Sequence, residues 1–170
     1  FSTKNLLVKS FGKNEYGQLG LGNLTNQNTP RTIPNPTNTN VDLTGVKQIA
    51  AGGDHTVLLM DDGTVKSFGR NNSGQLGLGN NTNKNTATSI SGLTNVKQIA
   101  AGGDHTVLLM EDGTVKSFGR NTNGGQLGLG NMTNQNIPTT IPDLLGVKQI
   151  AAGGNHTVLL MEDGTVKSFG

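Results

Sequence analysis

Three histidines, the only ones in the chain, are the residues best suited to acid–base or metal chemistry near neutral pH. They occupy equivalent places in a repeated segment, each followed by threonine: His55, His105 and His156. A catalytic or metal-binding set would have to converge, whereas residues that recur every 50 or 51 positions are spread over successive structural units. We therefore expect each histidine to hold its own turn by hydrogen bonds. We predict no catalytic residue and no metal site.

Paired carboxylates recur in the same way and could serve acid–base catalysis or cation binding: Asp61–Asp62, Glu111–Asp112 and Glu162–Asp163. Each pair precedes a glycine between two apolar runs, which is typical of the turn of a β-hairpin. The alternating spacing of a calcium-binding loop is missing. These carboxylates are therefore predicted to be turn residues.

The glycine-rich heptapeptide GQLGLGN could cradle a phosphate, and it begins at Gly17, Gly74 and Gly125. It lacks the lysine of a phosphate-binding loop, and no helical pattern follows it. An Asn-x-Thr glycosylation motif starts at its last residue, but such motifs arise easily in turns rich in Asn and Thr. We expect no cofactor.

The element that must position these residues is the segment VKQIAAGGDHTVLLMEDGTVKSFG at Val96–Gly119. It recurs almost letter for letter at Val46–Gly69 and Val147–Gly170. The triplet SFG marks the period, because its four copies are 57, 50 and 51 residues apart and the extra residues fall in the spacers. We predict one repeat array over residues 1–170. It comprises a single strand at 6–12 and units at about 13–69, 70–119 and 120–170.

Each unit reads as four short strands, which in the second unit are Ala87–Ile90, Val96–Gly102, His105–Met110 and Thr114–Gly119. Only 32% of the residues are hydrophobic and 26 are glycine, which argues against helices with broad apolar stripes. Val107–Met110 is apolar on both faces, so neighbouring units must cover it on both sides. The small residues Ala100–Gly103 indicate a crowded point near the axis of a radial array.

The order of these blocks, GQLGLGN, a proline-containing spacer, AAGGDH, a DG turn and VKSFG, resembles the regulator of chromosome condensation repeat family. The resemblance covers essentially the whole chain. It implies an all-β fold, with β-propeller blades of four antiparallel strands and about 50 residues per repeat. Family members have seven blades and usually a tryptophan where this chain has Phe11, Phe68, Phe118 and Phe169. Three units plus one strand predict an incomplete ring. The Asn-, Thr- and Gly-rich, cysteine-free repeats are typical of a bacterial or phage-like member.

Charge and apolar content exclude other classes of function. A net charge of +2, without a basic run or an aromatic cluster, does not favour nucleic-acid binding. The longest strongly apolar run, Val107–Met110, is far below the roughly 20 residues that cross a bilayer, so we expect no membrane insertion. The compartment stays unknown, with an extracellular or cell-surface location favoured.

No polar constellation breaks the repeat symmetry. We therefore expect a non-enzymatic scaffold that binds proteins or has a structural role, for example in a bacterial or phage surface or fibre assembly. Its partner would be another protein or further copies of the same array. Binding residues are expected where the units differ: Tyr16, Arg31, Asn35 and Asn38. The resemblance leaves guanine-nucleotide exchange or enzyme inhibition open, and an enzyme whose site is completed by residues outside the chain is a further alternative.

Overall fold

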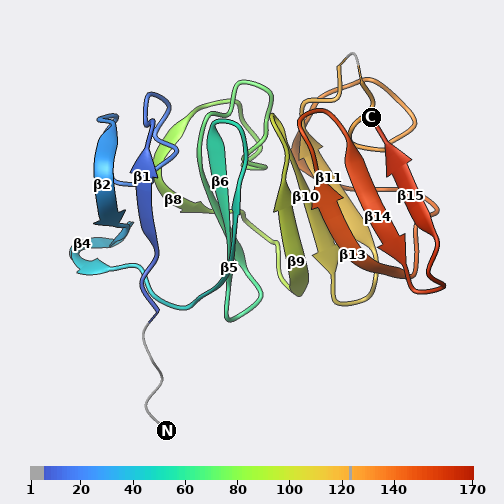
Figure 1. Ribbon diagram of the computed structural model, residues 1–170, viewed down its shortest axis with the longest axis horizontal. Coiled ribbons are helices and arrows are strands. Elements are labelled where there is room, and N and C mark those ends of the chain that lie inside the picture. Colours follow the sequence, from blue (N-terminus) through green and yellow to red (C-terminus); the bar gives the residue numbers. More distant parts are fainter. Residues whose placement is uncertain (1–5, 123) are drawn as a thin grey trace, which may run out of the picture.

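The computed structural model describes residues 6–122 and 124–170, and in that part of the chain all regular elements are short β-strands. The strands form sheets that follow one another along the chain, so that the colours in Figure 1 pass in order across the molecule. The described residues include no helix that is long and apolar enough to cross a membrane.

Two sheets have four antiparallel strands each. The first full blade has the strand order β5-β6-β7-β8, formed by β5 (Val46–Ala51), β6 (His55–Met60), β7 (Val65–Gly69) and β8 (Lys84–Ser89). The second full blade repeats this order with β9 (Val96–Ala101), β10 (His105–Met110), β11 (Val115–Gly119) and β12 (Gln135–Thr140). These sheets confirm the predicted fold, an all-β array of four-stranded antiparallel blades.

Smaller sheets flank the two full blades. The N-terminal strand pair consists of β1 (Lys9–Gly12) and β2 (Gln27–Thr32). The C-terminal blade has three strands, β13 (Val147–Ala152), β14 (Thr157–Met161) and β15 (Val166–Phe169). The insertion of the first unit forms a hairpin of β3 (Pro34–Asn35) and β4 (Asn38–Asp42). The array is thus an arc, as the count of units predicts.

The outermost strand of each blade differs from the sequence prediction. In the first full blade it begins at Lys84 and not at Ala87, because this strand is polar and gives no apolar signal at its start. It pairs with β7, in the register Lys66↔Ser89. Each full blade therefore takes its fourth strand from the sequence unit that follows its first three strands.

The core lies between the blades. On β10, Val107 and Leu109 pack with residues of the C-terminal blade, while Leu108 and Met110 pack against the first full blade. Val107, Leu108 and Leu109 are completely buried. The expectation that neighbouring units cover both faces of this strand is confirmed.

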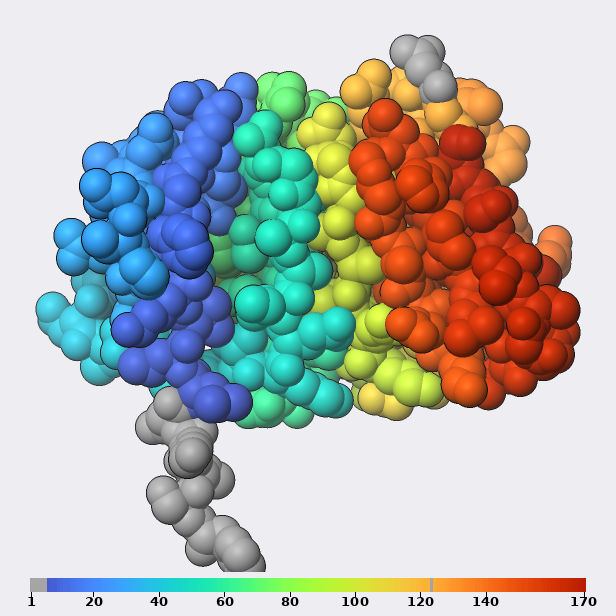
Figure 2. All heavy atoms as spheres, viewed as in Figure 1, coloured from blue at the N-terminus to red at the C-terminus, as the bar shows by residue number. Residues whose placement is uncertain are grey.

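The small residues at the inner ends of β5, β9 and β13 let successive blades approach closely. The amide of Gly53 donates to the carbonyl of Gly103 at 3.1 Å, and the amide of Gly103 donates to the carbonyl of Gly154 at 3.0 Å. A Cβ on Gly103 would lie only 2.6 Å from the carbonyl oxygen of Gly154. The predicted crowding is therefore real, and in the space-filling view successive colour bands lie directly against one another (Figure 2).

Candidate functional site

Each buried histidine ties its blade to the next one through a threonine hydroxyl. His55 Nε2 lies 3.0 Å from Thr106 Oγ1, and that hydroxyl donates its proton to the carbonyl of Gln75 at 2.9 Å. Because the threonine proton is already donated, the hydroxyl accepts from the ring, so Nε2 is the protonated nitrogen. His105 and Thr157 form the same contact at 3.0 Å. The hydrogen-bond partner of each of these histidines is therefore on the next blade, whereas the sequence analysis expected hydrogen bonds within the histidine's own turn.

These contacts make the two buried histidines structural groups. Burial lowers the pKa of His55 and that of His105 to about 4, because the imidazolium form would lose its hydration. Both rings are neutral at pH 7. His156, at the equivalent place in the C-terminal blade, is exposed. Within residues 6–122 and 124–170, no group of three His, Cys, Asp or Glu side chains is placed to hold a metal ion.

The repeated carboxylates close the hairpin turns. Asp62 Oδ1 accepts hydrogen bonds from the Thr64 amide at 2.9 Å and the Thr64 hydroxyl at 2.6 Å. These bonds lower the pKa of Asp62, and the same arrangement lowers the pKa values of Asp112 and Asp163. The predicted turn role is confirmed.

A buried asparagine that the sequence analysis missed organises each glycine-rich loop. In the second unit, Asn71 donates to the carbonyl of Asn80 at 2.8 Å and accepts from the amide of Leu76 at 2.9 Å. Asn14 and Asn121 hold the equivalent loops in the same way. The signal was available, because an asparagine stands two residues after the SFG triplet in all three units.

Charged and polar residues from the ends of successive strands form a row that we call the polar rim. It comprises Lys13, Arg70 and Arg120 with Asp54, Asp104 and Asn155. Arg70 Nη1 lies 3.8 Å from a carboxylate oxygen of Asp54 and 3.8 Å from one of Asp104, so it bridges the two full blades. These ion pairs are long and partly exposed, and each contributes little to stability. They hold the guanidinium groups of Arg70 and Arg120 close to the aspartates of the rim.

The predicted binding residues do not form one site. The ring of Tyr16 lies on the polar rim, 5.2 Å from the guanidinium carbon of Arg70 and 5.9 Å from Lys13 Nζ. Tyr16 follows the end of β1, whereas the β3–β4 hairpin follows the end of the antiparallel β2, so the two lie at opposite ends of that sheet.

The other three predicted residues make local contacts. Asn35 Oδ1 accepts from the Thr37 amide at 3.0 Å, and Asn38 Oδ1 accepts from the Asn40 amide at 3.2 Å. Arg31 lies on β2, where its Nε donates to Gln27 Oε1 at 3.3 Å. Arg31 and Asn38 are exposed. Binding by these residues stays a prediction.

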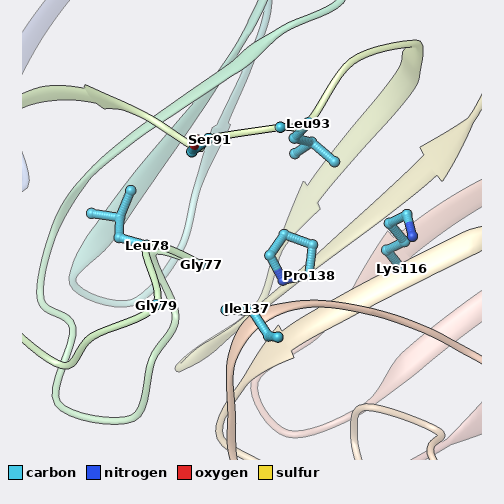
Figure 3. A pocket seen from close by; sticks show the side chains of 9 residues that line it. Gly77, Leu78, Gly79, Ser91, Leu93, Lys116, Ile137 and Pro138 are labelled. Atoms are coloured by element: carbon cyan, nitrogen blue, oxygen red, sulfur yellow. The ribbon is translucent and has the colours of Figure 1, made fainter.

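A groove of about 320 Å³ opens between the second glycine-rich loop and β12 (Figure 3). Leu78, Leu93, Ile137 and Pro138 line it, and Lys116 borders it while donating to Thr140 Oγ1 at 2.7 Å. The lining also includes the hydroxyl of Ser91, but it includes no histidine and no carboxylate that could activate this hydroxyl.

The stacked four-stranded sheets and their inter-blade ties define a repeat-built β-propeller segment. The profile of the regulator of chromosome condensation (RCC1) repeat matches residues 8–59, 62–109 and 112–160. The chain belongs to this family of repeats.

Its relatives are longer proteins of several kinds. The ultraviolet-B receptor UVR8 of Arabidopsis thaliana is 32% identical over 168 residues, which cover 96% of this chain and 37% of the receptor. The probable E3 ubiquitin-protein ligase HERC4 of Rattus norvegicus is 36% identical over 170 residues, covering 96% of this chain and 15% of the ligase. Yeast RCC1 (Prp20), solved bound to Kap60, superposes with a TM-score of 0.79 at 26% identity. That match covers 95% of this chain and 39% of Prp20.

Proposed function

We propose that this chain is a non-enzymatic propeller segment that binds a protein partner or further copies of its own array. The observation that carries the proposal is the stack of Tyr16 on Arg70 at the polar rim, at a place where the units differ. Tyrosine and arginine dominate the energetics of protein interfaces, and a ring already held against a guanidinium loses little entropy on binding. A surface or fibre assembly in a bacterium or phage suits such a scaffold.

The buried histidines and the turn carboxylates support a non-enzymatic role. His55 and His105 are neutral, buried and engaged between blades, and Asp62 is engaged in its turn. The two histidines are therefore not placed to accept a proton from a substrate, and Asp62 is part of a hairpin turn. Prp20 provides a precedent for protein binding, because it was solved bound to Kap60.

Further blades of the same type fit the two end faces. Phe11 is 64% exposed, although its counterparts Phe68 and Phe118 are completely buried. At the same N-terminal end, Ile49 is 60% exposed, whereas Ile99 is 3% exposed. At the C-terminal end, Val166 is 64% exposed, whereas its counterparts Val65 and Val115 are completely buried. Apolar strand faces of this kind invite association, so the chain studied alone should form oligomers or aggregate. Light scattering gives the solution mass, and a stable monomer that unfolds cooperatively would contradict this part of the proposal.

Comparative capture tests the rim. Immobilised wild-type protein and Tyr16→Ala are exposed to extract of the source cells, and the retained proteins are quantified by mass spectrometry. Lys97→Ala, an exposed change on β9, is the matched control. A protein retained by wild type and Lys97→Ala, but lost with Tyr16→Ala, supports the proposal. Identical retention of proteins by wild type and both variants argues against the polar rim as the binding surface.

An activity screen tests the enzymatic alternative. The purified protein is assayed against panels of hydrolase and lyase substrates. Turnover that survives changes at Tyr16 and Arg31 but disappears when His105 is replaced would overturn the non-enzymatic reading.

A further inference from the structure

The polar rim changes character in its third unit. The residue before the histidine is Asp54 in the first unit and Asp104 in the second, but Asn155 in the third. Arg70 consequently lies between two carboxylates, each 3.8 Å from its Nη1. Arg120, the counterpart of Arg70, has one carboxylate contact, to Asp104 at 3.9 Å, and its side chain is 41% exposed.

A buried carboxamide beside Arg120 also loses the contacts that its counterpart makes. In the second unit, Gln75 Nε2 donates to Asp104 Oδ1 at 2.9 Å, and Gln75 Oε1 accepts from the amide of Ser73 at 2.9 Å. Gln126 stands at the same place in the third unit and is 1% exposed, yet its Oε1 has no hydrogen-bond partner among the residues that the structure describes. A buried acceptor without a partner is costly, so the third unit lacks a stabilising contact that the second unit keeps.

The extra residue of the third unit explains the lost contact. The doubled glycine, Gly124–Gly125, lengthens the loop by one position. A Cβ on Gly124 would lie 2.6 Å from Gln126 Oε1, so the α-carbon of Gly124 lies beside this oxygen. A cavity of about 170 Å³ opens beside this loop, and Arg120, Thr122, Gly124, Gln126 and Asn155 line it.

We infer that this cavity binds an acidic side chain of a protein partner. The carboxylate pairs with the Arg120 guanidinium, which contacts one aspartate where its counterpart Arg70 contacts two. Asn155 keeps the hydrogen-bonding capacity of the site without adding a negative charge that would repel the ligand. The inference rests on the proposed protein-binding function and names the chemistry of one contact.

The size of the cavity favours the tip of a side chain over a whole metabolite. Water occupies about 30 Å³ per molecule, so a cavity of about 170 Å³ holds about five or six waters. An acidic residue on an exposed loop would insert its carboxylate and leave its backbone at the mouth.

Two short peptides test the site without a natural partner. N-acetyl-Gly-Glu-Gly-amide and its glutamine analogue are titrated into isotope-labelled protein, and the Arg120 and Gln126 side-chain N–H signals are followed by NMR. The glutamate peptide should bind at millimolar concentration and at least about fivefold more tightly than the glutamine peptide. Asn155→Asp restores the carboxylate that the other units have at this position. It should therefore lower the affinity for the glutamate peptide at least about fivefold without lowering the midpoint of urea unfolding.

The opposite results overturn the inference. These are the absence of saturable shifts, equal affinity for the two peptides, or undiminished binding by Asn155→Asp. The titration is independent of the capture experiment. Failed peptide binding with retained partner capture counts against this site alone, whereas peptide binding without any captured protein counts against the proposed function alone.

Discussion

Replacing Thr106 with valine should break the tie between the two full blades while preserving the branched shape of the side chain. Thr106 is completely buried, and its hydroxyl serves two groups. It accepts from His55 Nε2 at 3.0 Å and donates to the Gln75 carbonyl at 2.9 Å. Each buried polar group left without a partner costs about 1–3 kcal/mol, so Thr106→Val, which leaves two such groups, should lower the free energy of unfolding by about 2–6 kcal/mol.

The chain provides a matched control for this change. Thr56 occupies the same position in the first full blade, is only partly buried and donates to the Gln18 carbonyl at 2.8 Å. Among the described residues it has no histidine partner, so Thr56→Val leaves one group unpaired and should cost about 1 kcal/mol.

Urea unfolding at pH 7, followed by circular dichroism, measures both variants. Repeat arrays can unfold in steps, so midpoints are compared only where the slopes agree with wild type. Equal losses for Thr106→Val and Thr56→Val, or a loss below about 0.5 kcal/mol for Thr106→Val, would refute the argument.

Three further outcomes follow from the same contacts. The pKa values of His55 and His105 in the folded protein, about 4, lie below the usual value of 6.5 for histidine because burial removes the hydration of the charged ring. The contribution of the two histidines to the free energy of unfolding is therefore fully present above pH 6.5. It is lost as the pH falls toward 4, by about 3 kcal/mol for each histidine, and a free energy of unfolding that stays constant over that range in urea titrations would contradict this expectation. Gly103→Ala should destabilise the protein, because its Cβ would lie 2.6 Å from the Gly154 carbonyl oxygen. Gly154→Ala meets no atom within 4 Å and should be nearly neutral in thermal unfolding. Leu108→Ala should cost about 2–5 kcal/mol in urea unfolding, and a loss typical of a surface site would mean that β10 is not covered on both faces.

The strands that sequence reasoning placed well are those with a strong local signal. The second strand of the second full blade, His105–Met110, was predicted with its observed bounds, because an apolar run followed by an acidic residue and Asp-Gly specifies a strand and its turn. The outer strand β8 starts before its predicted position. It is polar and lies at the edge of its sheet, so its pairing with β7, not its own residues, specifies where it begins.

The site residues divide in the same way. The turn role of Asp62 followed from its neighbours in sequence, because its partner Thr64 is two residues away. The partner of His55 is 51 residues away on another blade, so the period of the repeat predicted a structural histidine but not its hydrogen bond. The sequence analysis also missed the polar rim, because the two aspartates that contact Arg70 lie on different blades.

The sequence by itself determined the repeat, the all-β class and the incomplete arc, because apolar alternation, Asp-Gly turns and glycine spacing act over a few residues. Only the tertiary structure decided which polar groups are satisfied. Gln75 and Gln126 stand in nearly identical segments, yet one is fully engaged and the other has a buried oxygen without a partner. The third unit has one inserted glycine and two other changed residues in this loop, and it has Asn155 in place of Asp104. The effect of these differences depends on contacts of about 3 Å between segments distant in the chain.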